Sequence, residues 1–210
     1  YTSTASLSSV TGGQGKTSNY TLTNTTKAFT ITRAKTATAS STNKTYNGAT
    51  QTGVTGSQVT WSGTQSAIDA GTYTAKATPT SNYAWSDGTT GAKTITWTMN
   101  KKSVAVTWGS TTFTYNGKAQ GPTASATSGV SGETIKVTRT TETNVGTYTS
   151  VASISSVSGG RGKASNYTLT GNTKQFTIAR AKTATASAAN KTYNGATQTG
   201  VTGSQVTWSG

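Results

Sequence analysis

The chain has 210 residues, about a quarter of them threonine, with 24 Gly, 2 Pro and 30% hydrophobic residues. Threonine suits a pleated strand and glycine interrupts helices, so this composition favours strands and turns. The absence of His and Cys excludes a histidine-based triad, a thiol nucleophile, a disulfide framework and the usual zinc sites. The net charge of +14 suggests nucleic acid as a partner, although charge alone bears on association and solubility rather than on function.

A long internal repeat organises the sequence. Residues 1–63 align without gaps to residues 148–210, at a period of 147, and only 11 of these 63 positions differ. Residues 44–63 recur unchanged as residues 191–210. Because both ends fall partway through a repeat, we expect the chain to be a window on a longer array.

A shorter and weaker repeat lies inside this period. Residues 45–48 match 114–117, residues 69–74 match 144–149, and Asn82-Tyr83 matches Asn166-Tyr167. Two alternating types of unit follow from this spacing. The predicted segments are the C-terminal part of a long-type repeat at 1–32, a short-type repeat at 33–100, a long-type repeat at 101–180 and the N-terminal part of a short-type repeat at 181–210.

Alternating hydrophobic and polar residues predict strands throughout the chain. In chain order, the predicted strands are 58–61, 71–77, 93–97, 103–108, 134–139, 147–154, 167–170 and 174–178. Short strands with frequent turn signals, in units of roughly 70 to 80 residues, indicate small β-sandwiches in tandem. No apolar run approaches the ~18 residues of a membrane-spanning helix.

Turns and junctions complete the predicted architecture. Asn47-Gly48 and Asn116-Gly117 are predicted hairpin turns, because Asn and Gly tolerate a positive φ. The junctions at residues 100–102 and 179–182 contain almost no spare residues. We therefore expect an all-β chain of immunoglobulin-like sandwiches that forms a semi-rigid, elongated rod.

The most informative motif is Asp/Asn-x-Gly-x-Tyr. Its two copies are Asp69, Gly71 and Tyr73, and Asn144, Gly146 and Tyr148. The motif looks like the tyrosine corner of immunoglobulin-like sandwiches, in which the Tyr hydroxyl bonds to nearby upstream backbone. Ala75 and Ser150 stand where antibody domains have a Cys, so these sandwiches must close by packing alone. We interpret both tyrosines as structural, with ligand stacking as the alternative.

These motifs resemble the bacterial immunoglobulin-like repeats of the MBG and YDG type, which occur in tandem in large secreted or surface-attached proteins. Tyr46-Asn47-Gly48 with Gln51, residues 69–73, Asn82-Tyr83 and the closing Thr94-Ile95 strand carry the resemblance. The resemblance implies an extracellular location and a stalk, adhesin or fibre module, without catalytic residues or a cofactor. The long-type repeat departs from the pattern by a Ser- and Gly-rich insertion around residues 155–164.

Catalytic interpretations find little support in the sequence. Residues 12–17 superficially resemble a phosphate-binding loop, but Val10 stands where that pattern needs a Gly. The second copy, residues 159–164, lacks the required hydroxyl, so we predict a glycine-rich hairpin loop. The four acidic residues form no repeated pair of the kind a glycosidase needs. We therefore predict that the chain is not an enzyme.

Two acids are candidates for a different chemistry. Some surface proteins of Gram-positive bacteria carry internal Lys–Asn or Thr–Gln cross-links, which form beside a buried acid. Asp69 and Glu133 are the acids that we would expect at such a link.

The predicted function is a structural stalk or fibre, whose partners are the neighbouring repeats of the same chain. The basic residues recur with the repeat and gather only weakly, at unit junctions, so a specific nucleic-acid reader is not indicated. One alternative is a binding module for glycans or for anionic cell-surface or matrix polymers. The other is a filament in which exposed strand edges pair between like chains.

Overall fold

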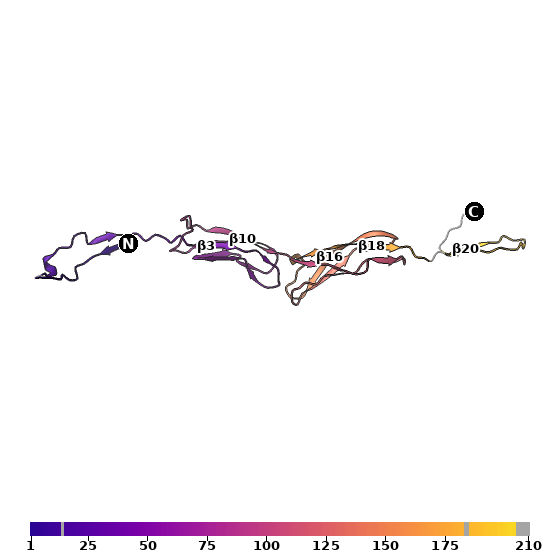
Figure 1. Cartoon of the computed structure of the whole chain (residues 1–210), viewed down its shortest axis with the longest axis horizontal. Helices are drawn as coiled ribbons and strands as arrows, with labels where there is room; N and C mark the ends of the chain where they lie inside the picture. The colour runs from indigo at the N-terminus through magenta and orange to yellow at the C-terminus, as the bar shows by residue number, and fades with distance from the viewer. Residues whose placement is uncertain (14, 183–184, 205–210) are drawn as a thin grey trace. The chain divides into compact units, whose positions relative to one another are not determined.

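The computed structural model describes residues 1–13, 15–182 and 185–204 (Figure 1). Within these ranges the regular elements are β-strands and two short 3-10 turns, with no α-helix. The predicted all-β class is therefore confirmed, while the immunoglobulin-like type, the tandem arrangement and the rod stay predictions. The same ranges contain no helix that is long and apolar enough to cross a membrane.

The chain packs as two compact units, each assembled from separate segments. The first unit comprises Tyr1–Thr42, Thr52–Ser66 and Tyr73–Trp97, and the second comprises Asn43–Gln51, Ala67–Thr72 and Thr98–Gly210. The second unit thus includes three short segments of the predicted short-type repeat, residues 43–51, 67–72 and 98–100. The four predicted segments stay predictions, and residues 183–184 and 205–210 of the last one lie outside the described residues.

The first of two four-stranded sheets has the order β4-β10-β9-β7. Strands β7 (Val59–Gly63) and β9 (Gly71–Pro79) pair antiparallel, whereas β4 (Lys44–Thr45) runs parallel to the end of β10 (Lys93–Asn100). Alternate residues of β9 and β10 point into the core, as the period of two predicts. The buried ones are Ala75, Ala77, Pro79, Trp97 and Met99.

The second four-stranded sheet has the order β13-β18-β16-β15. Strand β16 (Gly146–Ser158) pairs antiparallel with both β15 (Thr134–Arg139) and β18 (Thr173–Ala179). Strand β13 (Thr112–Thr114) runs parallel to β18. The two sheets therefore share one arrangement, in which the first strand in the chain lies parallel beside the last.

The remaining strands form two-stranded sheets. The antiparallel pairs are β1 (Thr2–Thr4) with β2 (Thr26–Ala28), β3 (Thr38–Ser41) with β6 (Val54–Ser57), β12 (Thr107–Trp108) with β14 (Ala124–Ser125), and β19 (Thr185–Ala188) with β20 (Val201–Ser204). Strand β11 (Lys102–Ala105) runs parallel to β17 (Tyr167–Thr170), and β5 (Gln51–Thr52) pairs with β8 (Ser66–Ala67). The predicted strands are all present, although the 103–108 strand divides at Val106 into β11 and β12.

The Asn-Gly pairs form turns, but the predicted hairpins are wrong. Gly48 has φ 81, and the Asn47 side chain accepts a hydrogen bond of 3.0 Å from the backbone of Ala49. Strand β4 before the turn pairs with β10, and β5 after it pairs with β8. Asn116-Gly117 likewise separates β13 from β14, which belong to different sheets. Asn-Gly fixes only the local φ values, whereas packing decides which strands pair.

The glycine-rich stretch of residues 159–164 is not a hairpin loop either. It leads from β16 into the 3-10 turn η2 (Ala164–Asn166) and then into β17, which pairs with β11. Residues 155–158, at the start of the predicted insertion, extend β16 along β15. The first copy of this stretch, residues 12–17, contains residue 14, which lies outside the described residues.

Candidate functional site

Of the predicted tyrosine-corner residues, Gly71 and Tyr73 lie in β9 and Gly146 and Tyr148 lie in β16, whereas Asp69 and Asn144 precede these strands. Tyr148 donates a long hydrogen bond of 3.4 Å to the carbonyl of Val145, three residues upstream. A Cβ on Gly146 would fall 2.8 Å from the Tyr148 hydroxyl, so glycine leaves room for the ring to fold back. The ring of Tyr73 lies 4.9 Å from that of buried Trp97. These contacts favour the structural interpretation of both tyrosines.

Glu133 is the centre of a buried hydrogen-bonded group in the second unit. Its Oε1 accepts a hydrogen bond from the Tyr46 hydroxyl and its Oε2 accepts one from the Tyr167 hydroxyl, each with an O–O distance of 2.6 Å. The two tyrosine rings meet edge to face, with centroids 5.4 Å apart. A buried carboxylate needs such donors, because desolvation without partners is costly. We call Tyr46, Glu133 and Tyr167 the Glu133 cluster.

Burial fixes the protonation state of both tyrosines in this cluster. Burial, together with the hydrogen bond to Glu133, raises the pKa of Tyr46 to about 12. The same two causes raise the pKa of Tyr167 well above its ordinary value. Both phenols therefore remain protonated donors near neutral pH, so the cluster serves as a structural anchor.

Asp69 lies in a second polar group of the same unit. Its Oδ2 is 2.6 Å from the ammonium of Lys163, and its Oδ1 accepts a hydrogen bond of 3.0 Å from Asn166. Asn166 is fully buried and also accepts a hydrogen bond of 2.8 Å from the backbone of Ala70. The hydrogen bonds from Lys163 and Asn166 lower the pKa of Asp69, which is therefore ionised near neutral pH.

These surroundings bear on the predicted cross-link chemistry. Asp69 does have a lysine and an asparagine beside it, whereas Glu133 has tyrosines. The Lys163 side chain is 2.6 Å from the Asp69 carboxylate, in an ion pair. The side chains of Lys163 and Asp69 are also 61% and 37% exposed, so the group lacks a dry environment. A cross-link at either acid stays a prediction.

Asp87 is a turn residue, as its neighbour Gly88 indicates. Its Oδ1 accepts hydrogen bonds from the backbone and the hydroxyl of Thr89, and its Oδ2 is 3.1 Å from Lys93. These partners, Thr89 first, lower the pKa of Asp87 to about 2. The Lys93 ammonium also lies 4.9 Å from the ring centroid of Trp85. The last acid, Glu142, pairs through its backbone with Gln120.

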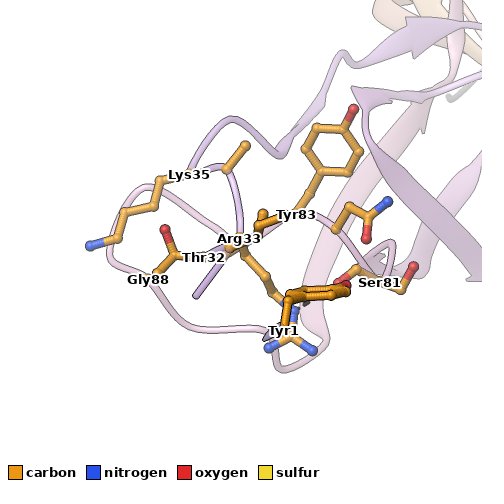
Figure 2. A pocket seen from close by; sticks show the side chains of 11 residues that line it. Tyr1, Thr32, Arg33, Lys35, Ser81, Tyr83 and Gly88 are labelled. Carbon is orange, nitrogen blue, oxygen red and sulfur yellow. Dashed lines mark hydrogen bonds between the residues drawn. The ribbon is translucent and has the colours of Figure 1, made fainter. Parts of the chain in front are cut away.

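A wide, open pocket of about 950 Å³ lies in the first unit (Figure 2). Its lining residues are Tyr1, Ile31, Thr32, Arg33, Ala34, Lys35, Ser81, Asn82, Tyr83, Ala84 and Gly88. The pocket carries two cationic side chains and two tyrosine rings, and we call it the cationic pocket. The only sign of this pocket in the sequence is the weak gathering of basic residues at the unit junctions.

The sequence also marked the members of the Glu133 cluster without showing that they meet. Tyr46 and Tyr167 stood out as repeat motifs, and Glu133 stood out as a scarce acid. Nothing in the alternation of residues relates positions 46, 133 and 167 to one another, because their encounter depends on how strands of different sheets pack.

Neither a metal site among the described residues nor a known relative adds information about the function. Within residues 1–13, 15–182 and 185–204, no three acidic side chains gather as a metal site would require. In comparisons with known proteins, no family model, no curated protein and no solved structure matches this chain.

Proposed function

We propose that the chain is part of the structural repeat region, a stalk or fibre, of an extracellular bacterial surface protein or adhesin. Its immediate partners are the neighbouring repeats of the same chain. The repeat at a period of 147 and the MBG-like motifs support the bacterial surface setting. The parallel pairing of the first and last strands in each four-stranded sheet supports the mechanical role most directly.

In both four-stranded sheets, the first strand lies parallel beside the last. Strand β13 is joined to β18 through Thr177 N to Thr111 O at 2.8 Å and Tyr115 N to Ala179 O at 2.9 Å. Strand β4 is followed by the equivalent bond from Tyr46 N to Asn100 O at 2.9 Å. Tension pulls such neighbours in opposite directions along their axes, so their hydrogen bonds are loaded together rather than one after another. This arrangement suits a spacer that resists extension.

Single-molecule force spectroscopy on the full chain, tethered by its two ends, tests this role. Tyr115→Pro removes the donor of the bond to Ala179, next to the parallel pair. Thr140→Pro removes the bond of 3.1 Å from Thr140 N to Val151 O, at the opposite edge of the same sheet. Both residues are exposed, so neither change disturbs the core directly.

We expect Tyr115→Pro to lower the unfolding force of this sheet clearly, and Thr140→Pro to leave it close to the original value. Urea unfolding of both variants serves as the control, because Thr140→Pro also loses a hydroxyl contact and should be at least as destabilised. Equal reductions in force for the two variants would show that the parallel pair does not carry the load, and would refute the mechanical role.

A further inference from the structure

We propose that the cationic pocket binds a carboxylate-bearing sugar residue of an anionic polysaccharide. This inference concerns what the chain contacts rather than how it bears tension, so it stands or falls separately from the force measurements. It rests on the framework that holds two cations in place, on the lack of an acidic partner for them, and on the mixed chemistry of the pocket wall.

The framework is a short parallel pairing between residues 33–37 and 81–84. Ala34 pairs with Tyr83, donating a hydrogen bond of 3.0 Å to Asn82 O and accepting one of 2.9 Å from Ala84 N. Arg33 and Lys35 flank this bridge, so their backbones are fixed although their side chains are exposed. The Nε of Arg33 donates 2.8 Å to Ser81 O, which leaves the two terminal guanidinium nitrogens for a ligand.

These two cations have no acidic partner among the described residues. The ion pairs there join Lys93 to Asp87 and Lys163 to Asp69. Asp87, the acid nearest in sequence to the pocket residue Gly88, is already bonded by Thr89 and Lys93. The positive charge of Arg33 and Lys35 is therefore free to meet an external carboxylate, which a guanidinium recognises well.

The wall around the two cations suits a sugar better than a nucleic acid. Tyr83 is half-buried against the core of Ala37, Ala77 and Trp85, so its ring is held firmly. Asn82 and Ser81 add amide and hydroxyl groups that can bond to sugar hydroxyls. Figure 2 shows Arg33, Tyr83 and Tyr1 among the side chains that line the pocket. Single-stranded nucleic acid, in contrast, is bound along grooves with several stacking aromatics.

The chain supplies its own matched control. The tripeptide Arg33-Ala34-Lys35 recurs as Arg180-Ala181-Lys182, with the same charge and similar exposure. Among the bridges between described residues, which exclude residues 183–184 and 205–210, none joins Ala181 to another segment as Ala34 is joined to Tyr83. If binding comes from diffuse charge attraction, changes to either copy should lower the affinity equally. If it comes from the cationic pocket, only changes to Arg33 and Lys35 should lower the affinity.

The test is binding of the full chain to polygalacturonate, measured by titration calorimetry at one fixed, low salt concentration. The pocket variant is Arg33→Gln with Lys35→Gln, and the control is Arg180→Gln with Lys182→Gln. We expect the pocket variant to lose about tenfold in affinity, as the loss of charge-assisted hydrogen bonds implies, and the control to bind almost as the original chain does. Lys35→Gln alone breaks no hydrogen bond within the chain and should show an intermediate loss in a fully folded protein.

Neutral dextran and inorganic polyphosphate complete the experiment. We expect no binding of dextran, and weaker binding of polyphosphate that is equally affected in both double variants. Equal losses of polygalacturonate affinity in the two double variants would overturn the proposal, since they would show diffuse charge attraction. Tighter binding of polyphosphate through Arg33 and Lys35 would overturn it as well, because the site would then be one for phosphate.

Discussion

A single carboxylate explains why several unusual residues stand where they do. A Cβ on Gly162 would lie 2.7 Å from Oε2 of Glu133, and one on Gly160 would lie 3.3 Å from Oε1. The glycine-rich stretch that resembles a phosphate-binding loop therefore wraps around a carboxylate of the chain itself. Glycines in that stretch are required by close approach, while the charge is satisfied by Tyr46 and Tyr167. The glycines can be recognised in the sequence, but their packing around Glu133 cannot be predicted from it.

The two tyrosines make the stability of the second unit sensitive to alkaline pH. In the unfolded chain Tyr46 ionises near its ordinary pKa of about 10, whereas burial raises its pKa to about 12 in the fold. A raised pKa contributes stability that is complete below pH 10 and is lost as the pH rises through 12. The difference of about two units corresponds to about 3 kcal/mol for Tyr46.

Urea unfolding at pH 8, 10 and 11 measures this loss. The control is the variant Tyr46→Phe with Tyr167→Phe, which has lower stability at pH 8 but lacks the phenols that titrate. We expect the free energy of unfolding to fall with pH more steeply in the original chain than in this variant. Parallel pH profiles would show that lysine deprotonation or other groups cause the loss.

At the scale of elements, local alternation identifies strands well and identifies their partners poorly. Strands β9, β10 and β18 lie where alternating Thr and hydrophobic residues predicted them, because each has one face in the core. The Asn-Gly turns have the expected positive φ at Gly48 and Gly117 but not at the asparagines, and they are wrong as hairpins, since pairing joins residues distant in the chain. The parallel pairs β4 with β10 and β13 with β18 left no local signal at all. The cationic pocket depends on a similar pairing, of residues 33–37 with 81–84.

The connection between β5 and β6 illustrates how tightly one element packs on another. Gly53 lies directly on the ring of Trp97, and an added Cβ would overlap that ring. Its backbone is also fixed, because Gly53 N donates 3.0 Å to Gln65 O and Gly53 O accepts 2.8 Å from Thr42 N. Trp97 cannot move away easily, since its Nε1 donates 2.9 Å to Thr64 O.

We therefore expect Gly53→Ala to lower the free energy of unfolding by about 3 kcal/mol, through overpacking in the core. Gly91→Ala is the matched control, because a Cβ there meets nothing within 4 Å and the φ of Gly91 is not in the left-handed region. That control should be neutral or more stable by up to about 1 kcal/mol. Denaturant unfolding of the two variants compares them directly, and similar values would contradict the packing argument.

At the scale of the whole molecule, the charge is strongly unbalanced. Eighteen basic residues face four acidic ones, and Glu133 is buried away from the surface. Two ion pairs are found among the described residues, and both are largely exposed. Exposed pairs contribute little to stability, whereas repulsion among many cations of one sign opposes compaction. Net repulsion should therefore outweigh attraction in the folded chain.

This balance predicts that salt stabilises the protein. Raising the salt concentration from about 0.01 M to 0.15 M shortens the screening length from about 30 Å to 8 Å. We expect the thermal midpoint to rise by about 4 °C, which corresponds to roughly 1 kcal/mol. The control replaces four exposed lysines with Gln, at positions 101, 118, 136 and 174, and should show a smaller rise, because less repulsion is left to screen. A midpoint that falls with salt would mean instead that the pairs of Lys163 with Asp69 and of Lys93 with Asp87 dominate, and the charge argument would fail.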